Sequence, residues 1–487
     1  MRTLRVAPLA LGAALFIASP HPSFAQNSQT QNSADQPSAD ALYDFLMARH
    51  LEALGDPKGA QAALEKAARE DPRSAEVRAE LAAYHLRRDE DDAAEMNAKA
   101  ALQINPDNSE AHRVLGLLYA GRADEAGRGQ AAQAQADMLV RDAISHLEKV
   151  TENPEGLTDI NLQYTLGRLY TRAAANGDRT MSRKAVQALG RVVNENPLSV
   201  QGRLALAQAY IADRDLNNAI ASLEEIVDDE PRVATALAQF QEQAGRLKDA
   251  ADSYTKALAV APNSRELKVR RVAVLLAAKD YARAAEFAAQ AQMQHPDDLR
   301  FPQLRATALM QGGDSARAIT VLEPVARANP SDATTQLSLA ELYTNAGRKN
   351  DAERTVRQLV ALEPGNADAL NYLGYMLADS GKQLDEAIRF VRKALDIEPD
   401  NPNYLDSLGW AYYRRGDYDQ AEKYITPASQ KMPRNATVQE HMGDILAKRG
   451  RWADAIAAWN RALMAEEGEV NKTAVEKKIS DARGKVR

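Results

Sequence analysis

The side chains that most often carry enzyme chemistry are scattered in this sequence. None of the histidines forms an HExxH pair, and the sequence contains no GxxxxGK[ST] loop and no GxSxG turn. Acidic pairs such as Asp228-Asp229 fall at expected helix ends, where solvated charge is the ordinary explanation. We therefore predict no catalytic residue, no metal site and no cofactor. The seven histidines are His21, His50, His85, His112, His146, His295 and His441.

A second group of residues has the composition of a binding surface. Rigid aromatic rings flanked by carboxamide, carboxylate and guanidinium groups are typical of interaction hot spots. Three neighbouring aromatic residues, Tyr372, Tyr412 and Trp459, are interpreted instead as packing residues, and so is Trp452. We predict that six residues line a groove that binds a partner: Asn371, Tyr375, Asp406, Trp410, Tyr413 and Arg414.

These six residues lie in two successive copies of one pattern, residues 366–399 and 400–433. Leu373-Gly374 in the first copy corresponds to Leu408-Gly409 in the second, and Pro399 corresponds to Pro433. The period of about 34 residues is typical of a helix–turn–helix repeat. Small residues at fixed positions let two antiparallel helices approach closely, and the proline ends the second helix.

The same pattern runs along most of the chain. Most intervals between its terminating prolines are 34 residues, and a polar residue two places after the proline is a candidate helix N-cap. The prolines are Pro72, Pro106, Pro154, Pro197, Pro231, Pro262, Pro296, Pro330, Pro364, Pro399 and Pro433. The candidate caps are Ser74, Asn108, Ser199, Ser264, Asp298, Asp332, Asn366, Asn401 and Asn435.

Departures from the period divide the array. Residues 40–231 hold repeats 1–5, with insertions in repeat 3 (121–140) and repeat 4 (176–183). Residues 232–467 hold repeats 6–12. Repeat 6 is short, so we expect a clipped first helix there and two lobes that meet near residue 231. Residues 468–487 are predicted to form a capping helix, because Val475, Ile479, Ala482 and Val486 share one face.

The first 25 residues read as a secretory signal. Arg2 and Arg5 precede a short apolar run, and Ser23-Phe24-Ala25 offers small residues for cleavage after Ala25. Residues 26–39 are polar and predicted to be a disordered linker. The apolar run is too short to span a bilayer. Because the chain has no cysteine, we expect neither disulfides nor a lipid anchor. The net charge of −7 argues against nucleic acid as a partner.

From Ala41 to Glu467 the chain resembles a bacterial tetratricopeptide repeat protein. The segments LGYMLAD (373–379) and DSLGWAYYRRG (406–416) further resemble envelope repeat proteins of Gram-negative bacteria. Some of those are outer-membrane lipoproteins that act as adaptors for a carboxyl-terminal processing protease; the missing cysteine departs from that group. The resemblance implies an all-α solenoid, a right-handed superhelix of about twelve helix pairs that binds ligands on its concave face.

These observations predict a periplasmic, non-enzymatic scaffold or adaptor that holds an extended peptide or a partner protein in the envelope, with a protease adaptor as one form of that role. An alternative from another class stays open: an accessory protein of polysaccharide or cell-wall export that contacts glycan through the same aromatic rings. Capture of a protein partner would favour the scaffold, whereas retention on purified glycan alone would favour the export accessory.

Overall fold

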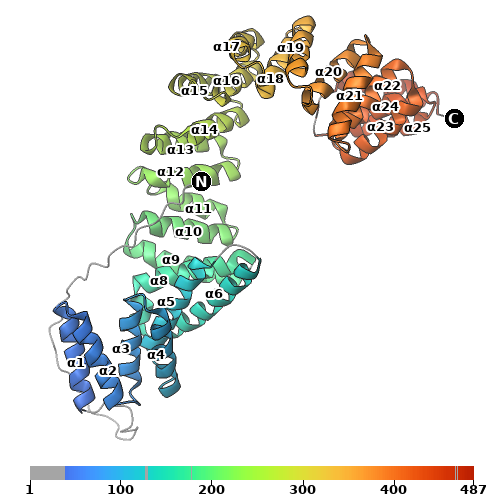
Figure 1. Ribbon diagram of the computed structural model, residues 1–487. Coiled ribbons are helices and arrows are strands. Elements are labelled where there is room, and N and C mark those ends of the chain that lie inside the picture. The colour runs from blue at the N-terminus through green and yellow to red at the C-terminus, as the bar shows by residue number, and fades with distance from the viewer. Residues whose placement is uncertain (1–38, 127–129, 177, 467, 469, 487) are drawn as a thin grey trace. The chain divides into compact units, whose positions relative to one another are not determined.

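The residues that the structure describes are mostly helical, and no strand occurs among them (Figure 1). In this computed structural model the described residues are 39–126, 130–176, 178–466, 468 and 470–486. The predicted all-α solenoid of helix pairs is confirmed. The predicted signal peptide (1–25), nearly all of the linker (26–39) and residues 127–129 of the repeat 3 insertion lie outside the described residues.

The helices fall into two compact units, residues 1–181 and 182–487. In the first unit α1 packs on α2, α3 on α4 and α5 on α6, as consecutive pairs (Figure 1). The helix α9 (Arg179–Glu195) spans the boundary. The helices of the first unit are α1 (Ala39–Ala53), α2 (Pro57–Glu70), α3 (Ala75–Leu86), α4 (Asp91–Ile104), α5 (Ser109–Glu125), α6 (Gln130–Thr151), α7 (Pro154–Thr158), α8 (Ile160–Ala173) and the 3₁₀ turn η1 (Ala174–Asn176).

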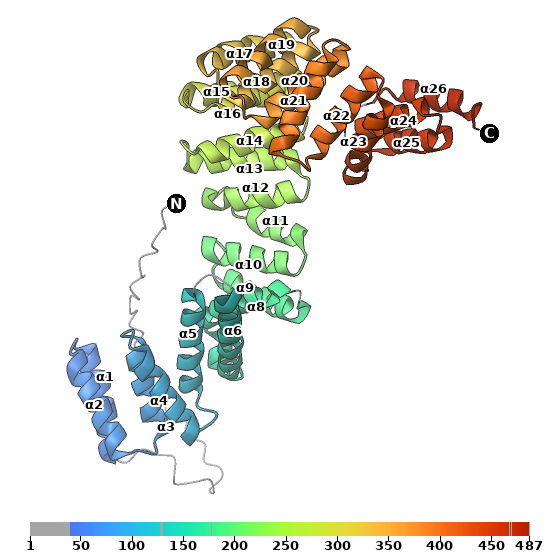
Figure 2. The same cartoon turned by 45° about the vertical axis from the view of Figure 1, so that its right-hand side comes forward.

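The second unit continues the pairs from α10 to α25 and ends in the single helix α26 (Figure 2). Its elements are α10 (Val200–Ala212), α11 (Leu216–Glu224), the 3₁₀ turn η2 (Pro231–Val233), α12 (Ala234–Gln243), α13 (Leu247–Val260), α14 (Arg265–Ala277), α15 (Tyr281–Gln294), α16 (Arg300–Gln311), α17 (Ser315–Ala328), α18 (Ala333–Asn345), α19 (Lys349–Leu362), α20 (Ala367–Ser380), α21 (Leu384–Ile397), α22 (Pro402–Arg415), α23 (Tyr418–Lys431), α24 (Ala436–Lys448), α25 (Trp452–Met464) and α26 (Lys472–Arg483).

Close approach within a helix pair depends on the glycine in the first helix. A Cβ atom on Gly374 would lie 2.4 Å from Val391 Cγ2, and one on Gly409 would lie 3.1 Å from Ile425 Cβ. At Gly443 it would meet the ring of Trp459 at 2.4 Å. Each neighbour belongs to the second helix of the same repeat. The glycines at this repeat position therefore set the distance between paired helices.

Replacing Gly409 by leucine should overpack the α22–α23 pair and lower the free energy of unfolding by about 1–3 kcal/mol. Because the stability of a solenoid is built from contacts between neighbours, the loss of amide protection should be greatest in repeats 10 to 12. Hydrogen exchange across the chain measures this. The matched control is Gly190→Leu in α9, where an added Cβ would meet nothing within 4 Å. Equal protection in both variants would contradict the assigned packing.

The predicted N-caps are confirmed at eight of the nine positions. In each, the side-chain oxygen accepts a hydrogen bond from a backbone N–H in the first turn of the next helix, as in Ser74 to Val77 and Asn366 to Ala369. Asp298 differs because α16 begins one residue later, after Leu299. Its carboxylate instead binds both the backbone N–H and the guanidinium of Arg300.

The irregular repeats have local causes. The repeat 3 insertion lengthens α5 to 17 residues and α6 to 22 residues. In repeat 6 the cap position holds Val233, which is fully buried and offers no acceptor, so the helix α12 starts from a 3₁₀ turn and is only 10 residues long. The preceding α11 has only 9 residues, although the sequence of repeat 5 reads as regular. The meeting of two lobes near residue 231 stays a prediction.

The last helix covers the end of the array. Val475, Ile479 and Ala482 of α26 are buried in one cluster with Trp459 of α25. The predicted fourth member of this face, Val486, is 47% exposed, because α26 ends at Arg483. The capping helix is therefore present but shorter than its apolar pattern suggested.

Candidate functional site

The six residues predicted to line a groove lie on two neighbouring first helices. Asn371 and Tyr375 belong to α20, and the other four belong to α22. The helix α22 packs against α20 on one side and α24 on the other. Asp406 is only 7% exposed, whereas the other five side chains are half-buried. We call Tyr375, Trp410 and Tyr413 the aromatic surface.

The centre of the aromatic surface is a stack of rings. Trp410 stacks with Tyr413 from the same helix, with 4.9 Å between ring centroids and 17° between planes. It also stacks with His441 of α24, with 4.0 Å and 15°. The guanidinium of Arg414 lies 5.7 Å from the Trp410 ring and donates from Nη1 to the backbone oxygen of Asp379 at 2.7 Å. The stack therefore joins three successive repeats.

A buried ion pair supports this stack from below. Nδ1 of His441 lies 2.9 Å from Oδ1 of Asp406, and both side chains are at most 10% exposed. Burial opposes the charged imidazole, but the carboxylates of Asp406, Asp444 and Glu440 outweigh burial and raise the pKa of His441 above its ordinary value. Asp406 therefore positions His441 beneath Trp410 and is itself largely covered.

The ion pair should make stability depend on pH. Because the pKa of His441 is raised in the folded state, the stabilisation is fully present below the unfolded-state pKa of about 6.5 and is lost as pH rises through the folded-state pKa. Urea unfolding between pH 6 and pH 9 should show this loss. The double variant Asp406→Asn, His441→Gln should lack it; a slope that persists unchanged would mean that another group is responsible.

The two tyrosines of the aromatic surface have perturbed hydroxyl groups. Burial, together with the carboxylates of Asp379, Asp406 and Glu440, raises the pKa of Tyr375 to about 12, and Arg414 opposes that rise. Burial and the nearby Asp444 likewise raise the pKa of Tyr413 to about 12. Both hydroxyls are therefore neutral hydrogen-bond donors at physiological pH.

Two buried polar atoms in this region lack partners. Oδ1 of Asn371 and Nε1 of Trp410 have no hydrogen bond within the described part of the chain. Leaving such a group unpaired costs roughly 1–3 kcal/mol. Asn371 lies one helical turn before Tyr375 on α20, but its side-chain oxygen forms no hydrogen bond among the described residues. The other five predicted residues are linked by the ring stack, the Asp406–His441 pair and the charges around Tyr375.

Sequence reasoning missed four residues of the site. His441 and the carboxylates Glu440 and Asp444 come from α24, and Lys478 comes from α26. Nζ of Lys478 lies 2.7 Å from both Glu440 Oε1 and Asp444 Oδ2. Glu440 and Asp444 occupy the repeat positions that Asp406 and Trp410 occupy one repeat earlier, so the period could have revealed them. His441 and Lys478 fall outside those positions and gave no such signal.

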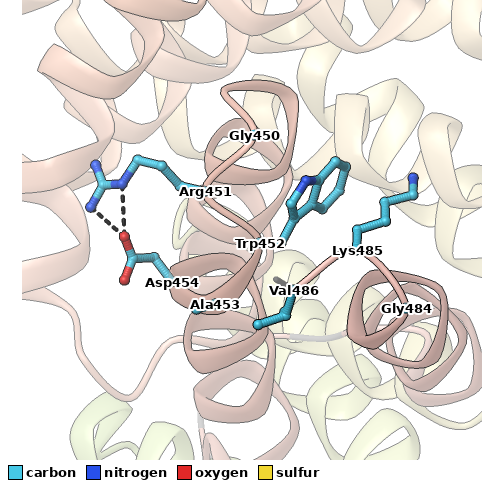
Figure 3. A pocket seen from close by; sticks show the side chains of 8 residues that line it. All are labelled: Gly450, Arg451, Trp452, Ala453, Asp454, Gly484, Lys485 and Val486. Atoms are coloured by element: carbon cyan, nitrogen blue, oxygen red, sulfur yellow. Dashed lines mark hydrogen bonds and ion pairs between the residues drawn. The ribbon is translucent and has the colours of Figure 1, made fainter.

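A separate hollow of about 760 Å³ lies at the end of the chain, between the start of α25 and the residues after α26 (Figure 3). Its main contact is the ammonium of Lys485, 4.3 Å from the centroid of the Trp452 ring. Arg451 on its rim already binds Asp454 through Nε at 2.7 Å. The polar groups here pair with each other and do not converge on a free space.

Other kinds of site find no support in the described residues. They contain no group of three or more histidine, aspartate or glutamate side chains placed to hold a metal ion. Among the helices described, none is both long and apolar enough to cross a membrane.

The fold and the site define the class of protein: a helical-repeat solenoid that carries an aromatic surface on its first helices. The chain belongs to the tetratricopeptide repeat family. Two family profiles described as Tetratricopeptide repeat match it, one over residues 196–359 and the other over residues 45–109, 337–402 and 407–468.

Curated relatives of the chain are bacterial. A TPR repeat-containing protein of Pseudomonas aeruginosa is 32% identical over 40% of this chain and 34% of its own length. Cellulose synthase operon protein C of Pseudomonas fluorescens is 25% identical over 72% of this chain and 27% of its own length. The chain thus spans about a third or less of the length of these relatives.

Similar solved structures include yeast Tom70, with a TM-score of 0.42 and 14% identity over 91% of this chain and 95% of that chain. Another is the structure of Naa15/Naa10 bound to HypK-THB, with a TM-score of 0.42 and 16% identity over 86% of this chain and 68% of that chain.

Proposed function

We propose that the chain is an exported, non-enzymatic scaffold that binds an extended segment of a partner protein across its aromatic surface. The observation that carries the proposal is the ring stack, in which Trp410 and Tyr413 of α22 are partly exposed and are held in place by each other and by the buried ring of His441 from α24. Rigid aromatic groups bind at a low cost in side-chain entropy, which is why they dominate interaction hot spots. Delivery of a partner to an envelope protease is one form of this role.

A second candidate function is an accessory role in polysaccharide or cell-wall export. It is favoured by the similarity to cellulose synthase operon protein C, which extends over 72% of this chain. The tyrosine and tryptophan rings of the aromatic surface also suit the apolar faces of sugar rings. Under this alternative the same residues contact glycan instead of peptide.

Site-directed crosslinking tests the scaffold. A photoreactive benzoylphenylalanine in place of Tyr413 should form an adduct with a partner protein when cells are irradiated. The matched control carries the same group in place of Ile397, which is 48% exposed at the end of the second helix α21. A protein adduct at position 413 that is missing at position 397 supports the scaffold. Equal adducts, or none at 413 together with retention on cellulose, contradict it.

Export predicts a defined N-terminus. Arg2 and Arg5, the short apolar run and Ser23-Phe24-Ala25 together predict cleavage after Ala25. The mature protein isolated from the periplasm should therefore begin at Gln26. N-terminal sequencing of protein from whole cells decides the matter, because a chain that begins at Met1 and stays in the cytosol is incompatible with an envelope role.

A further inference from the structure

Carboxylates from two helices border the aromatic surface. Asp379 is exposed near the C-terminal end of α20, and Glu440 and Asp444 lie on α24 close to His441. The charges of Asp379 and Glu440 help to raise the pKa of the Tyr375 hydroxyl, and the charge of Asp444 helps to raise the pKa of the Tyr413 hydroxyl. We call Asp379, Glu440 and Asp444 the acidic rim. Neutral tyrosine donors inside such a rim leave a surface that attracts positive charge.

The protein already places one ammonium group on this rim. Nζ of Lys478 lies 2.7 Å from Glu440 Oε1 and 2.7 Å from both oxygens of Asp444. Its helix, α26, follows α25 where the first helix of a further repeat would stand, so the lysine comes from the cap and not from a repeat. The contact shows that these two carboxylates have the geometry to bind a lysine side chain.

The remaining charges leave room for a second cation. Asp379 is 49% exposed, and its pairs with Arg414 and Lys349 are loose, at 3.7 Å and 3.8 Å. Exposed pairs of this kind contribute little and are easily replaced. Arg414 is committed to the backbone oxygen of Asp379 at 2.7 Å and to the Trp410 ring. The contact of Asp406 with His441 involves only one carboxylate oxygen, Oδ1.

We propose that the aromatic surface takes a basic segment of a partner protein, with a lysine or arginine side chain lying along Tyr375 and Tyr413 and its charged head on the acidic rim. Cations bind both to aromatic faces and to carboxylates, and the two attractions act together here. The inference rests on the proposed function and narrows it to one kind of partner. It also makes Lys478 an internal competitor for Glu440 and Asp444.

Defined peptides test the charge preference. The probes are fluorescein-labelled twelve-residue peptides of alternating lysine and glycine, glutamate and glycine, or serine and glycine, titrated with the mature full-length protein. Fluorescence anisotropy should show binding of the lysine peptide that weakens by about tenfold or more between 50 and 300 mM salt, because exposed charge pairs are screened. Equal binding of all three peptides, or preference for the glutamate peptide, overturns the proposal.

Matched variants locate the binding site. The change Asp379→Asn with Glu440→Gln should weaken the lysine peptide by about tenfold, the effect of losing two partly exposed charge pairs. The control Asp385→Asn removes a 79% exposed carboxylate on the second helix α21 and should change little. An equal loss in both variants would mean non-specific attraction to an acidic protein, and would overturn the proposal.

A variant of Lys478 should strengthen binding of the lysine peptide, whereas the variant of Asp379 and Glu440 should weaken it. Lys478→Met keeps the packing of the side-chain stem but frees Glu440 and Asp444 from their ammonium partner, so the lysine peptide should bind several-fold more tightly. Unchanged or weaker binding, with the melting temperature intact, contradicts the proposed competition. If the partner crosslinked at residue 413 binds independently of salt and of Glu440, the scaffold stands and only the basic partner is refuted.

Discussion

Replacing Trp459 by alanine should lower the free energy of unfolding by about 3–5 kcal/mol, the usual effect of removing a large core aromatic. Trp459 is 3% exposed, and its ring fills the space beside Gly443 in the first helix of its repeat. Its Nε1 donates to Asp444 at 2.9 Å, so the variant also removes a partner from the carboxylate that holds Lys478. Denaturant unfolding, followed by far-UV circular dichroism, measures the loss.

The control is another tryptophan of the same helix. Trp452 is half-buried at the start of α25, where it packs against the edge of the core cluster that contains Trp459 and contacts Lys485, as a packing residue should. Its replacement by alanine should cost less than that of Trp459, because only part of the Trp452 ring is buried. If Trp452→Ala proved the more damaging of the two, the assignment of the inner and outer faces of α25 would be wrong.

The repeat architecture was predictable because its signals are local and recur many times. Glycine or alanine at the close-approach position, a polar N-cap after each proline and the terminating proline itself each report one backbone requirement. The failures are equally local. Asp298 is not the N-cap of α16 because the helix begins one residue later than predicted. Val486 does not share the apolar face because α26 ends at Arg483. Periodicity does not determine where a helix frays.

The candidate site was predictable only in part. The repeat period placed Trp410, Tyr413 and Arg414 on one helix face, and the structure shows them in mutual contact. The period could not show that Asp406 forms an ion pair with His441. That pair joins two repeats, and His441 lies outside the positions expected to line the groove. The period also could not show that Lys478 of the C-terminal capping helix forms ion pairs with Glu440 and Asp444 of α24. Contacts between repeats depend on side-chain direction, which one-dimensional spacing leaves open.

These contacts decide which aromatic residues to change in a test of binding. Trp410 stacks on His441 and helps to cover the Asp406 pair, so its removal would disturb folding as well as binding. Tyr375 and Tyr413 are half-buried, and their hydroxyls form no hydrogen bond in the described chain, so they are the better pair. The matched control is Tyr424→Ala, a half-buried tyrosine of the second helix α23 that stacks on Tyr412.

The double variant Tyr375→Ala, Tyr413→Ala should weaken binding of the partner crosslinked at residue 413 by more than a hundredfold. Truncating a hot-spot residue costs about 2 kcal/mol or more, which is roughly a factor of thirty for each ring. Unfolding should change far less than for Trp459→Ala, because both rings are only partly buried and the Trp410–His441 stack remains. Titration calorimetry with the purified partner measures the affinity, and urea unfolding measures the stability. If the double variant unfolded as readily as Trp459→Ala while Tyr424→Ala abolished binding, the partner would lie on the second helices, and the aromatic surface would be part of the core.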